Sequence, residues 1–283
     1  MPPIALALVL SATVFHTAWN FVLKSEPRRL EAALLALATS VLLSAPGLMI
    51  YPLAELSARA WGLVLLSGVF ETAYLVTLTA ADRIGDLSLV YPIARGAAPL
   101  VVTPLAVLVL GERLSPFGLV GIALVVAGIF ATQSGFFRSA STAGARPAAA
   151  LALLTGVMIA GYSLVNKVGV GTLPVLLWAF LVQTLDALLV LIVLRARGSL
   201  EWPRPGAPRW RAAAIGVLML ASYLAILSAL TLAPVSYVVA GREVSIVVTA
   251  LVGAVILHER HSRRRVAGAV VIFAGLVVLA FSR

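Results

Sequence analysis

The sequence predicts an all-α membrane protein whose ten transmembrane helices form two inverted five-helix repeats. Three observations predict this fold. The 283 residues are 61% hydrophobic and only 11% charged, with a mean hydropathy of +1.07. Apolar runs of roughly 20 residues recur along the whole chain. The second half of the chain also repeats polar positions of the first half.

The composition excludes several classes of protein. Soluble domains carry about 25% charged residues, so the 11% found here is too little to coat a water-soluble globule. The absence of cysteine excludes disulfide scaffolds and thiolate metal sites. The net charge of +10 fits loop arginines close to anionic lipid headgroups. A face that binds nucleic acid would need a hydrated fold to display it.

Ten apolar runs, separated by charged or Pro/Gly clusters, are long enough to cross a bilayer core of about 30 Å as helices. Lipid cannot satisfy the backbone polar groups of an irregular segment, so each run is expected to be helical. The short connections leave no room for a soluble catalytic domain. The predicted spans are 4–23, 32–51, 61–80, 88–109, 117–136, 148–167, 174–194, 212–232, 236–257 and 266–282.

The distribution of basic residues predicts the orientation of the chain. With ten spans, both termini lie on one side, and that side carries four lysines and arginines against fifteen on the other. Positively charged loops are retained in the cytoplasm, so both termini are predicted to lie outside. The excess of Arg, Ala, Leu and Gly is typical of a GC-rich bacterial genome, and the predicted location is the bacterial inner (plasma) membrane.

An internal repeat emerges when the chain is shifted on itself by 147 residues. Arg95 then falls on Arg242, and the Glu-Arg pair at 112–113 falls on the pair at 259–260. Two glycines also match, Gly121 with Gly268 and Gly128 with Gly275. Apolar helices resemble one another by composition alone, but composition does not explain this ordered set of matches.

These matches divide the chain into a first repeat, 1–138, a connector, 139–147, and a second repeat, 148–283. A repeat of five spans is odd-numbered, so the second copy must insert upside down relative to the first. Inverted repeats are the architecture of secondary transporters, whose binding site lies near the membrane midplane between the repeats.

Two motifs carry a family resemblance: His16–Asn20 followed by Lys24 in the first span, and Tyr91–Gly96 in the fourth. Together with the Glu-Arg pairs, they resemble the EamA-type branch of the drug/metabolite transporter superfamily, over essentially the whole chain. The resemblance implies a carrier of amino acids, nucleotide-type metabolites or other small solutes. The same motifs are similar to a subgroup associated with phosphonate utilisation. The first span lacks the glutamate of the superfamily's small multidrug exporters, which argues against export of cationic drugs.

Arg95 and Arg242 lie inside predicted spans, where a charge costs at least about 2.5–3.5 kcal/mol and must face a cavity or a partner. Their depths are about 10 Å and about 9 Å from opposite faces. A guanidinium binds carboxylate or phosphonate oxygens bidentately, so both are candidates for binding an anionic solute. The alternative is structural pairing with Glu71 or Glu243, favoured for Arg242 because Glu243 adjoins it.

Glu71 lies near the midplane of the third span, and its counterpart in the second repeat is Leu220. A carboxyl group withdrawn from water can carry a proton, which makes Glu71 the first candidate for proton coupling. A fixed counter-ion to Arg95 is its alternative role. In the first span, His16 and Asn20 belong to a polar stripe on one helix face, which is more typical of a water-filled cavity than of a lipid-facing surface.

Other polar and aromatic residues complete the candidate set. Asp186 is a third candidate for proton coupling, although a helix–helix hydrogen bond is the simpler interpretation. Aromatic side chains are candidates for the cavity wall, and packing is their alternative role. The predicted substrate-binding residues are Arg95, Asn20, His16, Glu71, Tyr74, Arg242, Trp19 and Tyr91. The proton-coupling candidates are Glu71, His16 and Asp186.

The sequence therefore predicts a secondary active transporter, and not an enzyme, that moves a carboxylate- or phosphonate-bearing metabolite such as an amino acid by alternating access. Proton-coupled export is the expected mode. The expected partners are the solute, protons and membrane lipids, without nucleic acid, in a monomer or homodimer. No catalytic residue, cofactor or metal is predicted, because the chain has no P-loop, paired nucleophile and base, or metal-ligand spacing. The alternatives are an exporter of amine-type or lipophilic drugs and a non-transporting membrane enzyme.

Overall fold

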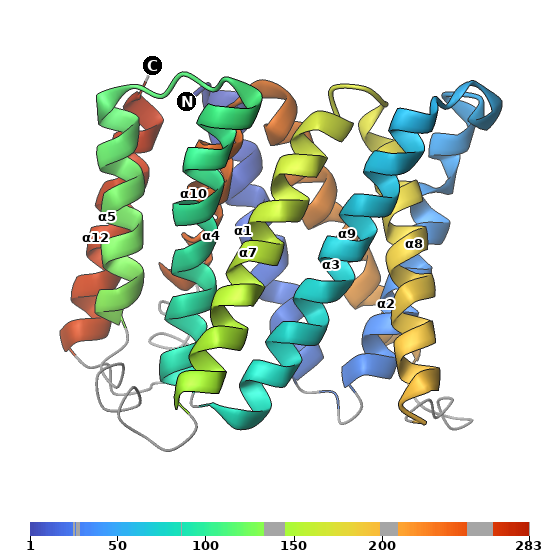
Figure 1. The fold of residues 1–283 in the computed structure, drawn as a ribbon, viewed down its shortest axis with the longest axis horizontal. Helices are drawn as coiled ribbons and strands as arrows, with labels where there is room; N and C mark the ends of the chain where they lie inside the picture. The colour runs from blue at the N-terminus through green and yellow to red at the C-terminus, as the bar shows by residue number, and fades with distance from the viewer. Residues whose placement is uncertain are drawn as a thin grey trace.

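The computed structural model describes residues 1–24, 26, 29–85, 87–132, 145–198, 209–247 and 263–282. These residues form ten α-helices and two short 3-10 helices, with no strand among them (Figure 1). The first-half helices are α1 (Pro3–Lys24), α2 (Arg29–Ser44), α3 (Ala58–Ile84), α4 (Leu87–Leu110) and α5 (Pro116–Thr132). The second-half helices are α7 (Ala145–Gly169), α8 (Val175–Ala196), α9 (Arg209–Leu232), α10 (Val235–Arg242) and α12 (Arg263–Phe281). The 3-10 helices are η1 (Ala45–Met49) and η2 (Leu53–Glu55).

The predicted all-α membrane fold is confirmed. Within the described ranges, seven helical segments are long and apolar enough to cross a membrane: α1, α2 together with η1, α3, α4, α7, α8 and α9. Helices α5 and α12 are apolar but shorter. Each of these nine corresponds to one predicted span, because an uninterrupted apolar run in lipid satisfies its backbone polar groups only as a helix.

The ninth predicted span, 236–257, differs from the structure. Helix α10 covers only eight residues and ends at Arg242. The backbone then tightens, because Glu243 N donates to Ala240 O and Val244 N donates to Gly241 O, three residues back in each case. The prediction of one continuous helix is therefore wrong at this point, and the break places Arg242 and Glu243 at a helix end inside the bundle. Residues 248–257 lie outside the described part of the chain.

Local sequence explains where several helices begin. Ser57 caps α3, because its Oγ accepts a hydrogen bond of 3.1 Å from the backbone N–H of Ala60. Helices α8 and α10 each begin directly after a proline, Pro174 and Pro234. Helix α7 begins at Ala145, inside the predicted connector 139–147, and the rest of that connector up to residue 144 lies outside the described residues.

The helices pack in pairs that are exchanged by a pseudo-two-fold axis. In repeat order, α1 corresponds to α7, α2 to α8, α3 to α9, α4 to α10 and α5 to α12. Helix α1 packs on α9 and α7 packs on α3, which is the same contact with the two repeats exchanged. The contact of α2 with α9 recurs as that of α8 with α3. Helices α5 and α12 correspond to each other and lie side by side in Figure 1.

Glycines on α5 and α12 show that the two repeats are inverted. A Cβ on Gly121 would lie 3.0 Å from Gly275 O, and one on Gly128 would lie 2.9 Å from Gly268 O. Residue numbers rise along α5 while those of their partners fall along α12, so the two helices are antiparallel. Small residues allow helix backbones to approach this closely in a membrane. The antiparallel pairing of corresponding helices is what inverted repeats require.

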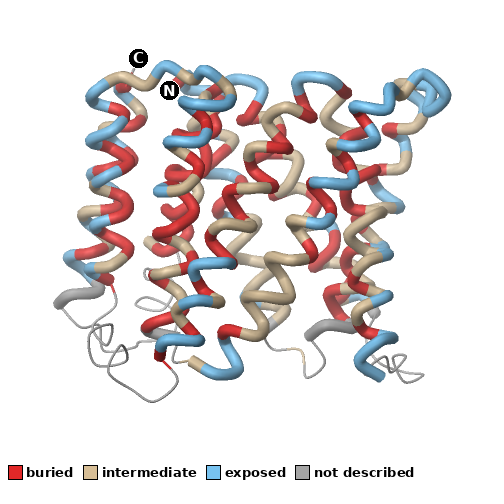
Figure 2. The backbone as a smooth tube through the Cα atoms, in the orientation of Figure 1, coloured by how far each residue is buried: buried red, intermediate tan, exposed pale blue. Residues whose placement is uncertain are grey.

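Both termini lie at the same end of the bundle (Figure 1). The amino group of Met1 donates to the carbonyl oxygens of Leu279 and Ser282 near the C-terminus. Buried and exposed residues alternate along the outer helices α5 and α12 (Figure 2), so their apolar outer faces are available to lipid. Helix α10, by contrast, is buried from Val235 to Gly241, which places its end at the centre of the molecule.

Candidate functional site

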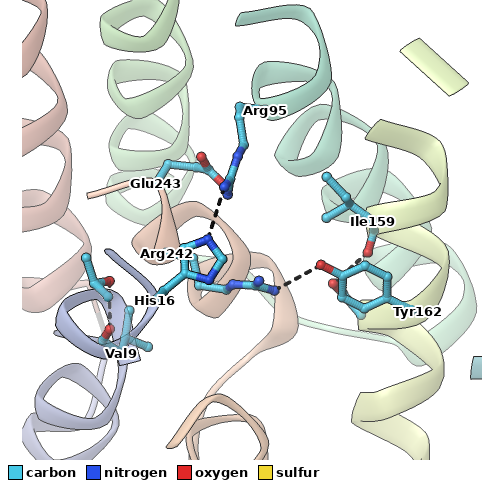
Figure 3. A network of polar contacts seen from close by, with 9 residues as sticks. Val9, His16, Arg95, Ile159, Tyr162, Arg242 and Glu243 are labelled. Atoms are coloured by element: carbon cyan, nitrogen blue, oxygen red, sulfur yellow. Dashed lines mark hydrogen bonds and ion pairs between the residues drawn. The ribbon is translucent and has the colours of Figure 1, made fainter. Parts of the chain in front are cut away.

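Three helices bring charged and polar side chains together at the centre of the bundle (Figure 3). Helix α4 supplies Arg95, helix α1 supplies His16, and the end of α10 supplies Arg242 and Glu243. Pro92 and Pro99 flank Arg95 within α4. The site therefore combines residues of both repeats.

Arg95 is held by one residue from each repeat. Its Nη1 donates to Oε1 of Glu243 at 3.4 Å, and its Nη2 lies 3.3 Å from Nε2 of His16. The guanidinium also lies 5.6 Å from the centroid of the Tyr91 ring, within range of a cation–π interaction. The Arg95 side chain remains 17% exposed, whereas that of Glu243 is 3% exposed.

Arg242 makes the corresponding contact in the second repeat. Its Nη1 donates to the Tyr162 hydroxyl at 3.4 Å, and its guanidinium lies 6.0 Å from the centroid of that ring. Tyr162 is 146 residues after His16, and Arg242 is 147 residues after Arg95. The contact between α4 and α1 in the first repeat thus recurs between α10 and α7 in the second.

Glu243 breaks this symmetry. It pairs with Arg95 of the opposite repeat, and among the described residues no ion pair joins it to its neighbour Arg242. The sequence-based expectation that adjacency favours the pairing of Arg242 with Glu243 is therefore not what the structure has. The two side chains point to different partners, Arg242 to Tyr162 and Glu243 to Arg95 (Figure 3).

A small cavity separates the two arginines. Its lining residues are Ala12, Thr13, His16, Arg95, Ser222, Ile226 and Arg242. Of the predicted substrate-binding residues Arg95, Glu71 and Asn20, only Arg95 lines this cavity. Asn20 instead donates from Nδ2 to the backbone carbonyl of His16 at 2.9 Å.

Glu71 belongs to a second polar cluster. Its Oε1 accepts hydrogen bonds from Tyr223 Oη at 3.0 Å and from Asn166 Nδ2 at 3.2 Å. Asn166 Oδ1 in turn accepts from Ser67 Oγ at 2.7 Å and from Trp178 Nε1 at 2.9 Å. Four helices, α3, α7, α8 and α9, meet in this cluster. Among the described residues no ion pair joins Glu71 to Arg95, so the proposed counter-ion role has no contact to support it.

Asn166 and Trp178 were not singled out from the sequence. A usable signal existed for Asn166, since it is one of two asparagines in the chain and lies 146 residues after Asn20. Nothing in the sequence marked Trp178, which is fully buried and donates to Asn166 from the first turn of α8.

The other candidate site residues contact side chains on their own helix or on a neighbouring helix. Asp186 Oδ1 accepts from Thr72 Oγ1 at 2.7 Å, which joins α8 to α3. The rings of Trp19 and His16 meet edge to face at 4.9 Å, as do those of Tyr74 and Tyr162 at 6.0 Å. Asp186 therefore has the helix–helix hydrogen bond that was its simpler interpretation.

A further contact between repeats lies at the end of the bundle that holds the termini. Glu112, in the turn after α4, accepts hydrogen bonds from the backbone N–H of Val235 and, at 2.8 Å, from the Ser236 hydroxyl. A carboxylate at this position satisfies free N–H groups of the first turn of α10. Nearby, Lys167 donates to the carbonyls of Leu230, in the last turn of α9, and of Ala233, which follows this helix.

The described residues contain no cluster of three or more His, Asp or Glu that could hold a metal ion. The arrangement suits binding of a solute: cationic donors from two repeats, a small cavity between them with apolar and polar lining residues, and a separate buried carboxyl group. Its chemistry is hydrogen bonding and charge compensation.

Fold and site together define a polytopic membrane protein of two inverted five-helix repeats with a polar centre. The EamA-like transporter family model matches residues 3–133 and 146–281, and the chain belongs to this family. Members of this family are membrane transporters of small solutes. A solved structure titled "Crystal structure of protein" is similar in fold, with a TM-score of 0.74 and 17% identity, over 97% of this chain and 95% of that one. No curated protein gives a significant match.

Proposed function

We propose that this transporter is a secondary active carrier of a small solute that bears an anionic group, such as an amino acid or another carboxylate or a phosphonate. Arg95 and Arg242 bind the anionic group in the central cavity, and His16 lies beside it. The repeats, 1–138 and 148–283, alternate access to the cavity by moving against each other. Protons drive the cycle, and export is its direction. The proposal includes no cofactor or metal.

One observation carries the proposal of an anionic solute. Two partly buried arginines line one cavity, and among the described residues a single carboxylate, that of Glu243, pairs with either of them. Uncompensated charge is costly away from water. An anionic group on the solute supplies the missing negative charge, and the guanidinium geometry favours carboxylate and phosphonate oxygens.

Alternating access is supported by the pseudo-two-fold exchange of helix contacts. The contact of α1 with α9 and that of α7 with α3 are equivalent, so a shift of one repeat can be matched by an opposite shift of the other. The contact of Glu112 with α10 joins the repeats at the end of the bundle that holds the termini. This contact closes that end in the state described here and opens in the opposite state.

Proton coupling is assigned to Glu71. Its carboxyl group is held by an amide and a phenol, and among the described residues no cation is within ion-pair distance of it. A carboxyl group with neutral partners can change its protonation without breaking an ion pair. Because α3, α7 and α9 meet at Glu71, its protonation state can bias the packing of one repeat against the other.

Orientation follows from the charge count, and location from the composition. The side opposite the termini carries fifteen basic residues, and the side of the termini carries four. Since positively charged loops stay in the cytoplasm, both termini are assigned to the outside. We assign the chain to the bacterial inner membrane on its composition, and export is assigned on family resemblance.

Export of an amine-type or lipophilic drug is the second candidate function. The observation that favours it is the presence of two carboxyl groups, Glu71 and Asp186, on adjacent helices α3 and α8 without an arginine partner among the described residues. An amine could pair with either of them.

Flux measurements in proteoliposomes test both candidates. The purified protein is reconstituted, and uptake is measured for amino acids, small phosphonates and quaternary amines, with and without an imposed pH gradient. Saturable, gradient-dependent flux of an anionic or zwitterionic solute supports the proposal. Flux of amines alone would overturn it in favour of drug export, and protein-free liposomes give the background.

A further inference from the structure

Glu243 is a buried acid whose pairing is incomplete. The residue is only 2% exposed, and its Oε1 contacts Arg95 at 3.4 Å. Among the described residues its Oε2 has no hydrogen-bond partner, although it is fully buried. A satisfied arginine–carboxylate pair has two parallel hydrogen bonds of about 2.7–2.9 Å. The Arg95–Glu243 pair has one, and it is longer.

Among the described residues, Arg95 uses only part of its donor capacity. A guanidinium carries five N–H groups, of which one reaches Glu243 and another lies near His16 Nε2. The same guanidinium lines the cavity, together with Thr13, Ser222 and Arg242. A second anion entering the cavity therefore finds Arg95 available but already partly neutralised.

We infer that Glu243 is a built-in competitor of the solute: its carboxylate holds Arg95 while the cavity is empty and is displaced from Arg95 by the anionic group of the solute. The inference rests on the proposed function, because it concerns the same site. It makes Glu243 a residue that sets the affinity of the site, since the solute must bind Arg95 more favourably than a tethered carboxylate does. When the solute leaves, the return of Glu243 to Arg95 restores the charge balance and favours release.

The test uses the full-length protein in detergent with two anionic probes, methylphosphonate and acetate, and a cationic probe, tetramethylammonium. Binding is measured from the rise in melting temperature with probe concentration. The apparent Kd equals the intrinsic Kd divided by the fraction of protein whose site is free. If Glu243 occupies Arg95 about nine-tenths of the time, then Glu243→Gln lowers the apparent Kd for either anion by about tenfold.

The matched control is another Glu–Arg pair outside the cavity. Glu26 lies 3.1 Å from Arg211 at the start of α9, so Glu26→Gln also removes a carboxylate from an arginine. We expect Glu26→Gln to leave the Kd for both anions unchanged. In an Arg95→Gln background we expect Glu243→Gln to bring no gain, because the group for which the two anions compete is absent.

Three outcomes would overturn the inference: Glu243→Gln binds the anions no more tightly than the unaltered protein, neither protein binds either anion, or Glu243→Gln loses binding of tetramethylammonium. The last result would make Glu243 a ligand for a cation. If Glu243→Gln does not fold, Glu243→Asp takes its place, since shortening the side chain weakens its hold on Arg95 and is expected to give a smaller gain. Failure of the proposed function is recognised separately, as absence of solute flux in proteoliposomes of the unaltered protein.

Discussion

Arg95 of the first repeat donates to Glu243 of the second repeat across 3.4 Å. The pair bridges α4 and α10, which correspond to each other in the two repeats. A contact that joins the two repeats is expected to change when one repeat moves against the other. A solute that displaces Glu243 from Arg95, as we infer above, also removes this link between the repeats.

Arg95→Lys is expected to reduce flux of the anionic solute at least tenfold while the protein stays folded. Lysine retains the positive charge that compensates the Glu243 carboxylate, but it lacks the planar guanidinium group that binds two oxygens at once. Arg95→Ala is the harsher change, because removing one partner of a buried pair costs about 3–5 kcal/mol. Flux in proteoliposomes and the melting temperature together separate the two effects. Arg59→Lys, at an exposed position at the start of α3, is the control, and equal flux for the two lysine variants would remove Arg95 from the site.

Glu71→Gln is expected to preserve the cluster around Asn166 but to abolish the dependence of flux on an imposed pH gradient. Glutamine is nearly isosteric and can still accept from the Tyr223 hydroxyl, yet it cannot take up or release a proton. The measurement is solute flux with the proton gradient in either direction and without one. Glu55→Gln, at an exposed position in η2, serves as the control. An unaltered response to the gradient would eliminate Glu71 as the proton carrier.

The helix bundle could be predicted because its signals can be read from the sequence alone. Each apolar run is contiguous, and the repeat is found by comparing the chain with itself after a shift of 147 residues. Inversion followed from the odd number of spans, and the antiparallel contacts of Gly121 with Gly275 and of Gly128 with Gly268 agree with it.

The partners inside the site could not be predicted in the same way. Glu71 reaches Asn166 because α3 packs on α7, and no sequence pattern states which helices are neighbours. Glu243, which pairs with Arg95, lies at a helix break after Arg242, and the apolar residues on both sides of these two charged residues gave no sign of the break. The position of a residue along its helix could thus be predicted by counting residues, whereas the direction of each side chain could not.

Gly128→Leu is expected to lower the melting temperature strongly, because α5 and α12 touch at this point. A Cβ on Gly128 would lie 2.6 Å from the Ile272 side chain and 2.9 Å from the Gly268 carbonyl. Overpacking typically costs about 1–3 kcal/mol, and the backbone atoms nearby cannot move aside as a side chain can. Gly62→Leu on α3 is the control, since a Cβ there meets nothing within 4 Å. Similar melting temperatures for the two variants would contradict the close contact of α5 with α12.

Glu112→Ala is expected to destabilise the start of α10 by about 0.5–2 kcal/mol, the usual cost of losing a helix cap. The carboxylate accepts from the backbone N–H of Val235 and from the Ser236 hydroxyl, so its removal leaves buried donors unpaired. Because the contact also joins the two repeats, the same variant is expected to expose the cavity more readily from the end of the bundle that holds the termini. Labelling of a cysteine introduced at Thr13, in this naturally cysteine-free chain, by an impermeant thiol reagent added from that side measures the exposure. Combining Glu112→Ala with Ser236→Ala should cost less than the sum of the single changes, and full additivity would show that the two side chains act independently.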